Sequence, residues 1–234
     1  MTDWLRHVPI AHRGLHDHAA GIIENSLSAF AAAMAASYAI ELDLRLSRDG
    51  EAIIFHDATL ERLTPQTGAV ETHSAEFLGR LSLNGSADRI PTLPDLLAKV
   101  QGRVPLLLEL KRSDTPVGRL ETRVADLLAA YTGSVAVQSF DPAVVAWFRA
   151  HAPAIRRGLL AQCERDLLTP AVVVAQFIAY DVTALPAFGP AFLRRIGLPV
   201  MAWTVKDKHT WSIAAVHADN IIFEGIRPES TGGA

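Results

Sequence analysis

Short apolar runs alternate with amphipathic segments along most of the chain. Nine runs rich in β-branched or aliphatic residues are separated mainly by segments with helical spacing, and this alternation predicts a parallel sheet whose strands are connected by helices. Thr92, followed by Asp95, has the spacing of a capping box and predicts the start of one such helix. The expected strands span residues 8–12, 39–44, 52–56, 105–110, 134–140, 156–160, 177–182, 199–205 and 220–225.

The second and third runs are joined by the segment RLSRDGE, which is too short for a crossover helix. Its Asp49-Gly50 dipeptide favours a two-residue turn, and such a turn would return His56 opposite Asp43. The third run is therefore predicted to be an antiparallel hairpin arm. The remaining strands suit an α/β fold of the (β/α)8 TIM-barrel class with a β-hairpin extension of its second strand, and a doubly wound open sheet is the alternative.

Residues 57–91 interrupt the alternation with a polar, turn-rich segment that has no long helical pattern. Long irregular stretches in compact domains are usually functional insertions. No linker or shift in composition marks a boundary elsewhere, so we expect one barrel domain over residues 1–234. The insertion is expected to lie over the C-terminal face of the barrel, where the catalytic groups of this fold gather.

Three carboxylates occupy positions that are expected to lie inside the barrel. Glu41 and Asp43 flank Leu42 and therefore point to the same side of their strand, and Glu109 lies in the otherwise apolar run PLLLEL. Ionised groups in such positions are costly unless they are paired or bound to a metal. Singly, Glu41 or Asp43 could form a salt bridge with Arg45 or with a neighbouring residue of the barrel. Together, the three carboxylates favour a hard divalent cation, Mg²⁺ or Ca²⁺.

Histidines and cationic side chains are expected at the same edge of the sheet. His12 and His56 each end a strand, and an imidazole can give or take a proton near neutral pH, so the pair suits general acid–base catalysis. Arg13 and Lys111 could bind the oxygens of a phosphate, and Trp203 could form an apolar wall.

Together these groups describe metal-assisted cleavage of a phosphate ester, in which a Lewis acid, a positive clamp, a base and an acid share one cavity. Gln138 lies near the end of the strand that follows the one carrying Glu109, and we expect it to support the site. The sequence has no P-loop, GxSxG, HExxH or GxGxxG pattern, which argues against the common NTPase, hydrolase, zinc-protease and dinucleotide-binding classes.

Composition and charge exclude further classes of protein. Half of the 234 residues are apolar and a fifth are charged, so the chain can bury a large core. The net charge of −3 gives no basic field for nucleic acid, and no apolar stretch approaches the roughly 18 residues of a membrane span. The single cysteine, Cys163, cannot form an internal disulfide. We expect a cytoplasmic protein that acts on a small molecule, without a nucleic-acid partner or stable membrane association.

The chain resembles the glycerophosphodiester phosphodiesterase family, a group of TIM-barrel enzymes similar to phosphoinositide-type phospholipase C. The resemblance covers nearly the whole chain and rests on many short motifs in the same order. These motifs are HRG at 12–14, ENS at 24–26, IELDLRLSRDG at 40–50, FHDATLERLT at 55–64, IPTLPDLL at 90–97, LELK at 108–111, QSF at 138–140 and AWTV at 202–205.

The resemblance implies a hydrolase that uses a divalent cation, usually Mg²⁺ or Ca²⁺, to release glycerol 3-phosphate and an alcohol from glycerophosphodiesters. Glu24 and Asn25 match a family segment after the first strand, for which we expect a supporting, hydrogen-bonding role. Carried over residue by residue, the metal ligands would be Glu41, Asp43 and Glu109, the catalytic histidines His12 and His56, and the phosphate-binding residues Arg13 and Lys111.

The sequence departs from the family pattern at a few positions, including residues 221–225, where IIFEG replaces the more usual IITD. Glu224 could still provide a polar group at this strand end. Two other functions stay open. A lysophospholipase D or phosphoinositide-type phospholipase would favour an exposed apolar or basic rim, and a non-catalytic phosphate-ligand-binding barrel would be expected to lack a histidine or a ligand residue.

Overall fold

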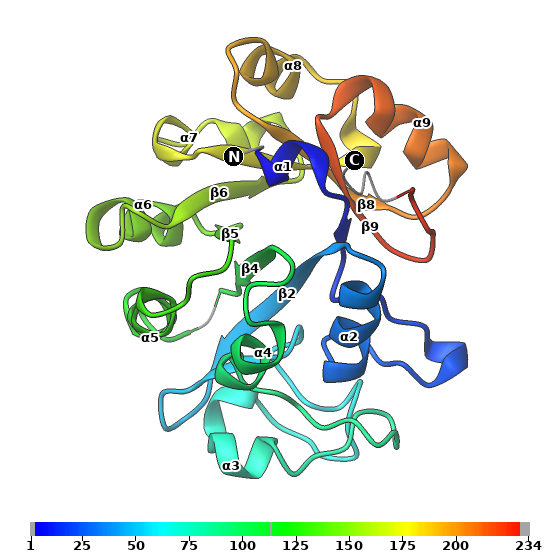
Figure 1. The fold of residues 1–234 in the computed structure, drawn as a ribbon. Coiled ribbons are helices and arrows are strands. Elements are labelled where there is room, and N and C mark those ends of the chain that lie inside the picture. Colours follow the sequence, from blue (N-terminus) through cyan, green and yellow to red (C-terminus); the bar gives the residue numbers. More distant parts are fainter. Residues whose placement is uncertain (1–2, 113, 230–234) are drawn as a thin grey trace.

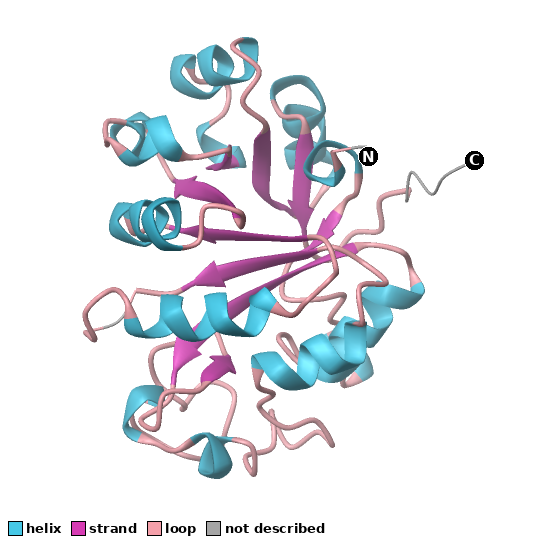
Figure 2. Cartoon of the chain, turned by 60° about the vertical axis from the view of Figure 1, so that its left-hand side comes forward, coloured by secondary structure: helices cyan, strands magenta, loops and turns pink. Residues whose placement is uncertain are grey.

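A computed structural model describes residues 3–112 and 114–229 and has a ring of strands surrounded by helices (Figures 1 and 2). The strands are β1 (Ile10–Ala11), β2 (Ala39–Leu46), β3 (Ala52–Ile54), β4 (Leu106–Leu110), β5 (Val135–Ser139), β6 (Arg156–Ala161), β7 (Phe177–Asp181), β8 (Val200–Val205) and β9 (Asn220–Phe223). The α-helices are α1 (Trp4–His7), α2 (Leu27–Ala35), α3 (Ala75–Leu78), α4 (Leu93–Val100), α5 (Arg119–Ala129), α6 (Pro142–His151), α7 (Ala171–Val174), α8 (Phe188–Arg195) and α9 (Lys208–His217). Short 3-10 helices are η1 (His18–Ala20), η2 (Val70–Thr72), η3 (Glu164–Leu167) and η4 (Val182–Ala184).

All strands except β3 are parallel and form a closed barrel. The order around the barrel is β1, β2, β4, β5, β6, β7, β8 and β9, and β9 pairs back to β1. Helices on the outside connect successive strands from β4 onward (Figure 2). The predicted TIM barrel is therefore confirmed, and the closing pair of β1 with β9 excludes the open sheet.

The predicted hairpin arm is present, but its register is shifted by one residue. β3 pairs antiparallel with β2, and Leu44 lies opposite Ile54. The backbone N–H of Phe55 donates to the carbonyl oxygen of Asp43 at 3.0 Å, so Phe55 rather than His56 is the partner of Asp43. The predicted two-residue turn is wrong because Arg48 joins Asp49 and Gly50 in a three-residue loop, in which Gly50 has a φ of 90°. His56 follows one residue later and still lies close enough for its charge to act on Asp43.

Apolar side chains fill the inside of the barrel below the polar edge. Leu5 of α1 belongs to this interior cluster, so the N-terminal helix closes one end of the barrel. Gly158 of β6 leaves the space that the ring of Phe177 occupies, because a Cβ atom at Gly158 would lie 2.0 Å from that ring. β6 and the ring of Phe177 are therefore packed so closely that there is no room for a methyl group at position 158.

Gly158→Ala is therefore expected to destabilise the fold by about 1–3 kcal/mol, the usual cost of overpacking a core. Urea denaturation measures this as a lower midpoint at unchanged slope. The Gly158→Ala/Phe177→Leu double variant should lose less stability than the sum of the single variants, because the smaller side chain gives the methyl group room. A wild-type midpoint for Gly158→Ala would mean that the Phe177 ring does not occupy this space.

Residues 57–91 form the predicted insertion, and it has its own apolar cluster. The cluster joins residues of the insertion, such as Leu60, Leu63 and Val70, to Ile53 and Phe55 of the hairpin arm. In Figure 1 the insertion, with α3, extends from the end of β2 and lies beside α4. It is therefore packed onto the hairpin arm, and its polar side chains have fixed positions relative to β2.

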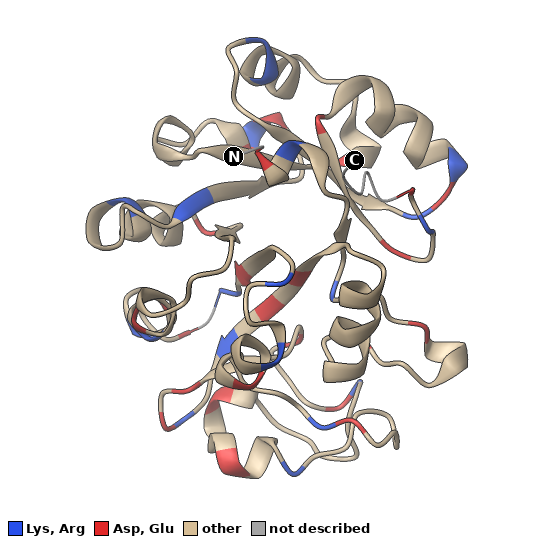
Figure 3. Ribbon diagram, in the orientation of Figure 1, with Lys and Arg blue, Asp and Glu red and all other residues tan. Residues whose placement is uncertain are grey.

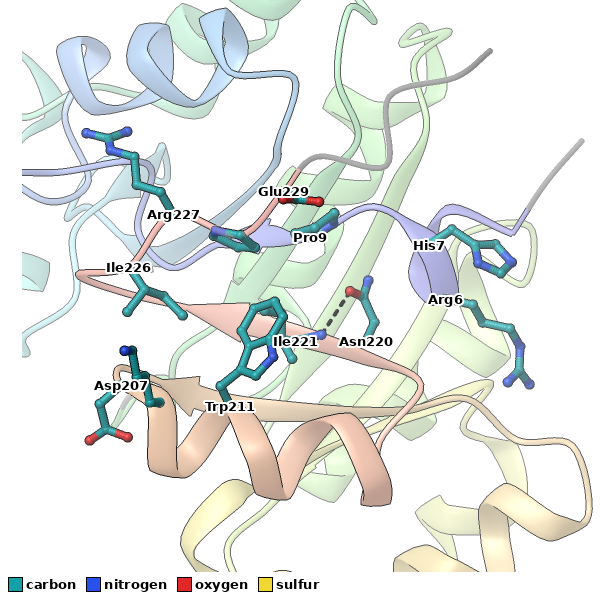
Figure 4. Close-up of a pocket in the computed structure, with 12 residues that line it drawn as sticks. Arg6, His7, Pro9, Asp207, Trp211, Asn220, Ile221, Ile226, Arg227 and Glu229 are labelled. Carbon is teal, nitrogen blue, oxygen red and sulfur yellow. Dashed lines mark hydrogen bonds between the residues drawn. The ribbon is translucent and has the colours of Figure 1, made fainter.

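The chain after β9 crosses the outside of the barrel without a helix in residues 224–229. It is held there by the hydroxyl of Tyr38, which donates to the carbonyl oxygen of Pro228 at 2.5 Å. A groove of about 920 Å³ lies between this segment, β9 and α9, with Trp211, Ile221 and Ile226 among its lining residues (Figure 4).

Over the ranges 3–112 and 114–229, the helices are too short or too polar to cross a bilayer.

Candidate active site

Three buried carboxylates meet on the neighbouring strands β2 and β4. Glu41 and Asp43 lie on β2, whose acidic positions are visible in Figure 3, and Asp43 is directly beside Glu109 of β4 in the strand register. One oxygen atom from each carboxylate lies within 4.8 Å of the others. The three residues are at most 5% exposed. The convergence expected from the strand periodicity is therefore present.

Two cations partly neutralise this carboxylate cluster. Lys111 Nζ lies 2.5 Å from Glu109 Oε1 and 2.9 Å from Asp43 Oδ1, and Arg13 Nε lies 3.3 Å from Asp43 Oδ2. Burial raises the pKa of Asp43, but the charges of Lys111 and Arg13 outweigh it and hold this pKa well below its usual range. Asp43 is therefore ionised at neutral pH.

Ionisation of the other two carboxyl groups is disfavoured without a further cation. Burial and the charges of Asp43 and Glu109 raise the pKa of Glu41 well above its usual range, and burial with the charge of Asp43 raises the pKa of Glu109 to about 7. Glu41 Oε2 accepts from the backbone N–H of Arg13 at 2.9 Å, but Glu41 Oε1 is buried without a partner among the residues that the structure describes. An unpartnered oxygen in a carboxylate cluster with uncompensated charge fits a divalent cation.

His12 follows β1 and makes a hydrogen bond to a carboxylate that directly follows β9, the strand that closes the barrel. Its Nδ1 lies 2.9 Å from Oε2 of Glu224, and Lys206 Nζ lies 3.3 Å from the same oxygen. The hydrogen bond from His12 lowers the pKa of Glu224 to about 2, whereas burial lowers the pKa of His12. Because ionised Glu224 can only accept, Nδ1 of His12 is the donor and Nε2 is left for other partners.

His56 has a similar partner on the chain that follows the hairpin arm. Its Nδ1 lies 2.7 Å from Asp57 Oδ1, and Arg62 Nε donates to the other oxygen of Asp57 at 2.5 Å. Burial lowers the pKa of His56. Arg45 Nε donates to the backbone carbonyl oxygen of His56 at 2.8 Å, so Arg45 fixes this turn, and the alternative salt bridge from Arg45 to Glu41 or Asp43 is absent from the described residues.

Glu24 connects the insertion to the phosphate-binding candidate Arg13. Its two oxygens accept hydrogen bonds of 2.8 and 2.9 Å from Arg62, and Oε1 also accepts from Arg13 at 2.7 Å. Burial raises the pKa of Glu24, but the hydrogen bonds from Arg62 and the charge of Arg13 lower it to about 2. Glu24 is therefore an anion that is hydrogen-bonded to the Arg13 guanidinium and holds it in place.

Asn25 orients one of the clustered carboxylates. Its Nδ2 donates to Asp43 Oδ2 at 2.7 Å, and its Oδ1 accepts from the backbone N–H of Asp43 at 3.3 Å. Asn25 and Arg13 both have positive φ angles, 56° and 55°. Both residues lie in the chain between β1 and α2, and both contact β2.

Gln138 and Trp203 add polar atoms that have no partner in the described parts of the chain. Gln138 lies beside Glu109 in the strand register, and its Oε1 is buried and unpaired. Trp203 Nε1 is also buried and unpaired, and the ring of Phe140 packs edge-on against Trp203 at 5.4 Å. These atoms are available to a ligand with a hydroxyl or phosphate group.

Sequence reasoning missed Arg62 and Phe140 at this site. Arg62 lies 38 residues from Glu24, and no local pattern relates the two, because their contact depends on how the insertion folds back. Phe140 directly follows β5, and its place in the QSF motif, next to a strand end, was the available signal.

Known proteins similar to this chain share one description. The glycerophosphoryl diester phosphodiesterase family matches residues 12–224. A putative glycerophosphodiester phosphodiesterase of Bacillus subtilis, YhdW, is 29% identical over 91% of this chain and 92% of its own. Among solved structures, a glycerophosphodiester phosphodiesterase from Agrobacterium tumefaciens has a TM-score of 0.75 and 25% identity, covering 95% of this chain and 97% of its own. An Oleispira antarctica phosphodiesterase, solved with its product sn-glycerol-3-phosphate, has a TM-score of 0.81 and 22% identity over 93% of this chain and 92% of its own.

Proposed function

The chain belongs to the glycerophosphoryl diester phosphodiesterase family, and on this premise we propose a metal-dependent hydrolysis of glycerophosphodiesters in which His12 and His56 transfer protons. The protein is a glycerophosphodiester phosphodiesterase, a phosphoric diester hydrolase. In the proposed reaction, water and the diester give glycerol 3-phosphate and an alcohol. The solved Oleispira antarctica phosphodiesterase with the same fold contains the first of these products.

The pairing of both histidines with carboxylates supports this proposal most directly. His12 and His56 each engage a carboxylate through Nδ1, at 2.9 and 2.7 Å, and both lie close enough to Asp43 to act on its pKa. Each ring therefore keeps Nε2 for proton transfer near the carboxylate cluster. A non-catalytic barrel would not need two imidazoles held in this way.

Glu41, Asp43 and Glu109 would hold the cation, which their oxygen donors and uncompensated charge fit. We favour Mg²⁺ or Ca²⁺, since only oxygen atoms are offered. When bound, the cation would neutralise charge on the phosphate and polarise it toward attack. Lys111, which lies on two of the carboxylates, would then be free to contact a phosphate oxygen.

The remaining side chains would bind and orient the diester. Arg13, fixed by Glu24, would donate to phosphate oxygens. Trp203 would form a wall of the cavity, with its free Nε1 facing an acceptor, and Gln138 would accept from a hydroxyl. One imidazole removes the proton of the attacking oxygen, the bond from phosphorus to the alcohol oxygen breaks, and the other imidazole protonates that oxygen.

Release of glycerol 3-phosphate from glycerophosphodiesters tests this function. The panel carries choline, ethanolamine, glycerol and inositol, and each reaction is run with Mg²⁺, with Ca²⁺ and with excess chelator. We expect release with at least one cation and its loss with chelator, restored when the cation is added back. Equal release in chelator would contradict the metal requirement, and no release with either cation would contradict the proposed substrate class.

A further inference from the structure

A second cavity lies beside the site, between the loop after β1 and the chain after β9. Its volume is about 440 Å³, within the usual range for pockets that bind small molecules. Its polar lining includes His16, Asp17, Glu224 and Arg227, and Ile226 contributes an apolar surface. None of the function described so far uses this space.

The cavity shares one residue with the proton-transfer machinery. Glu224 lines the cavity and also accepts the hydrogen bond from His12. His16 lies close enough to both Glu224 and His12 for their charges to act on its pKa. The cavity therefore adjoins the side of the His12 ring that carries Nδ1, next to the place where His12 would act on the substrate.

Both walls of the cavity are held by backbone hydrogen bonds. Asp17 and Ile22 exchange two hydrogen bonds of 2.9 Å, which close the loop after β1. On the other wall, the backbone N–H of Glu224 donates to the carbonyl oxygen of Val205 at 3.0 Å. The cavity is thus formed before a ligand arrives, which lowers the entropic cost of binding.

The lining offers donors and acceptors with opposite charges close together. Ionised Glu224 accepts and the Arg227 guanidinium donates, whereas His16, whose pKa is lowered by burial, is neutral near pH 7 and supplies one donor and one acceptor. In the described chain, neither ring nitrogen of His16 has a hydrogen-bond partner. Such a mixture matches hydroxyl groups, each of which both donates and accepts.

A cationic headgroup fits this lining poorly. Glu224 already has Lys206 Nζ at 3.3 Å and the His12 ring at 2.9 Å, so its charge is largely compensated. Arg227 adds a positive charge, and the other carboxylate of the lining, Asp17, accepts from the backbone N–H groups of Ala19 and Ala20 through Oδ1. A quaternary ammonium group binds best to the faces of Trp, Tyr or Phe rings, and the lining residues include none of these.

We propose that this cavity binds the leaving alcohol of the substrate and selects an uncharged alcohol with several hydroxyl groups, a polyol. The inference rests on the proposed diester hydrolysis and adds the substrate class to it. His16 is then a specificity-determining residue that contacts the alcohol.

The test compares kcat/KM for glycerophosphoinositol, whose alcohol is a polyol, with that for glycerophosphocholine. We expect wild-type enzyme to prefer glycerophosphoinositol. His16→Phe, which keeps a ring but loses both hydrogen-bonding atoms, should lower kcat/KM for glycerophosphoinositol about tenfold and leave glycerophosphocholine within about twofold. His16→Gln restores one donor and one acceptor and should recover part of the loss.

His151→Phe is the matched control, because His151 stacks on Trp147 at the end of α6, away from this cavity. It should leave both substrates unchanged. Equal effects of His16→Phe on the two substrates, or no effect on either, would overturn the role of the cavity while the diesterase function stands. No release of glycerol 3-phosphate from either substrate by the wild-type enzyme would overturn the function and this inference together.

Discussion

His12→Ala is expected to lower kcat by about 10²–10⁴-fold, the usual contribution of a positioned general acid or base. The substitution removes the ring that Glu224 orients through Nδ1, and with it the Nε2 atom that would exchange the proton. His12 lies at the end of β1 rather than among the apolar side chains of the core, so the fold should persist. Steady-state kinetics, with circular dichroism to verify folding, measures the effect.

An activated substrate separates the two proton-transfer roles. A p-nitrophenyl phosphodiester has a leaving group that needs no proton, so loss of the general acid should matter little for it, whereas loss of the general base should matter as much as for an alkyl ester. Measuring His12→Ala and His56→Ala on both esters therefore assigns the roles. His151→Ala, at an exposed position, is the control. Wild-type turnover of alkyl esters by His12→Ala would exclude proton transfer by His12.

Glu41→Gln is expected to reduce the affinity for Mg²⁺ or Ca²⁺ by at least about tenfold, because cation affinity depends on ligand charge. Activity at limiting cation should fall in parallel. The same substitution removes a carboxyl group whose ionisation is disfavoured by burial and by the charges of Asp43 and Glu109, so the metal-free variant should be at least as stable as metal-free wild-type protein. Added cation should then raise the unfolding temperature of the wild type more than that of the variant.

Titration calorimetry and thermal unfolding with and without cation measure both effects. Glu76→Gln is the matched control, since Glu76 is exposed on α3 and pairs with Arg80. An unchanged cation affinity in Glu41→Gln would remove Glu41 from the ligand set. A metal-free variant much less stable than wild type would indicate that Glu41 has a structural role instead.

Much of the barrel could be predicted from the sequence because each strand is a short apolar run with clear flanks. The nine predicted runs correspond to β1–β9, and β3 was separated as a hairpin arm by the shortness of its connection. Its register was not predictable from the Asp49-Gly50 dipeptide alone. The loop includes Arg48, and nothing in the residue types decides between a two-residue and a three-residue loop.

The carboxylate cluster was also predictable, since side chains alternate along β2 and the C-terminal ends of parallel strands meet at one edge. The hydrogen-bond partners of the histidines were harder to predict from the sequence. The contact between His12 and Glu224 joins residues 212 apart and exists because β9 closes on β1. Contacts such as this depend on closure of the whole barrel, which local patterns do not encode.

The seam where β1 pairs with β9 is one of the two shortest strand pairings in this barrel, the other being that of β1 with β2. β1 has only two residues, Ile10 and Ala11, in register with β9, and the chain after β9 continues to Glu229 without forming a helix of its own. Backbone amides here should exchange with deuterium faster than those of β4 or β5, because local opening breaks few contacts. Opening of the seam separates His12 from Glu224 while the other strands stay paired. On heating, catalysis should therefore be lost below the temperature at which the barrel unfolds, and it should return on cooling.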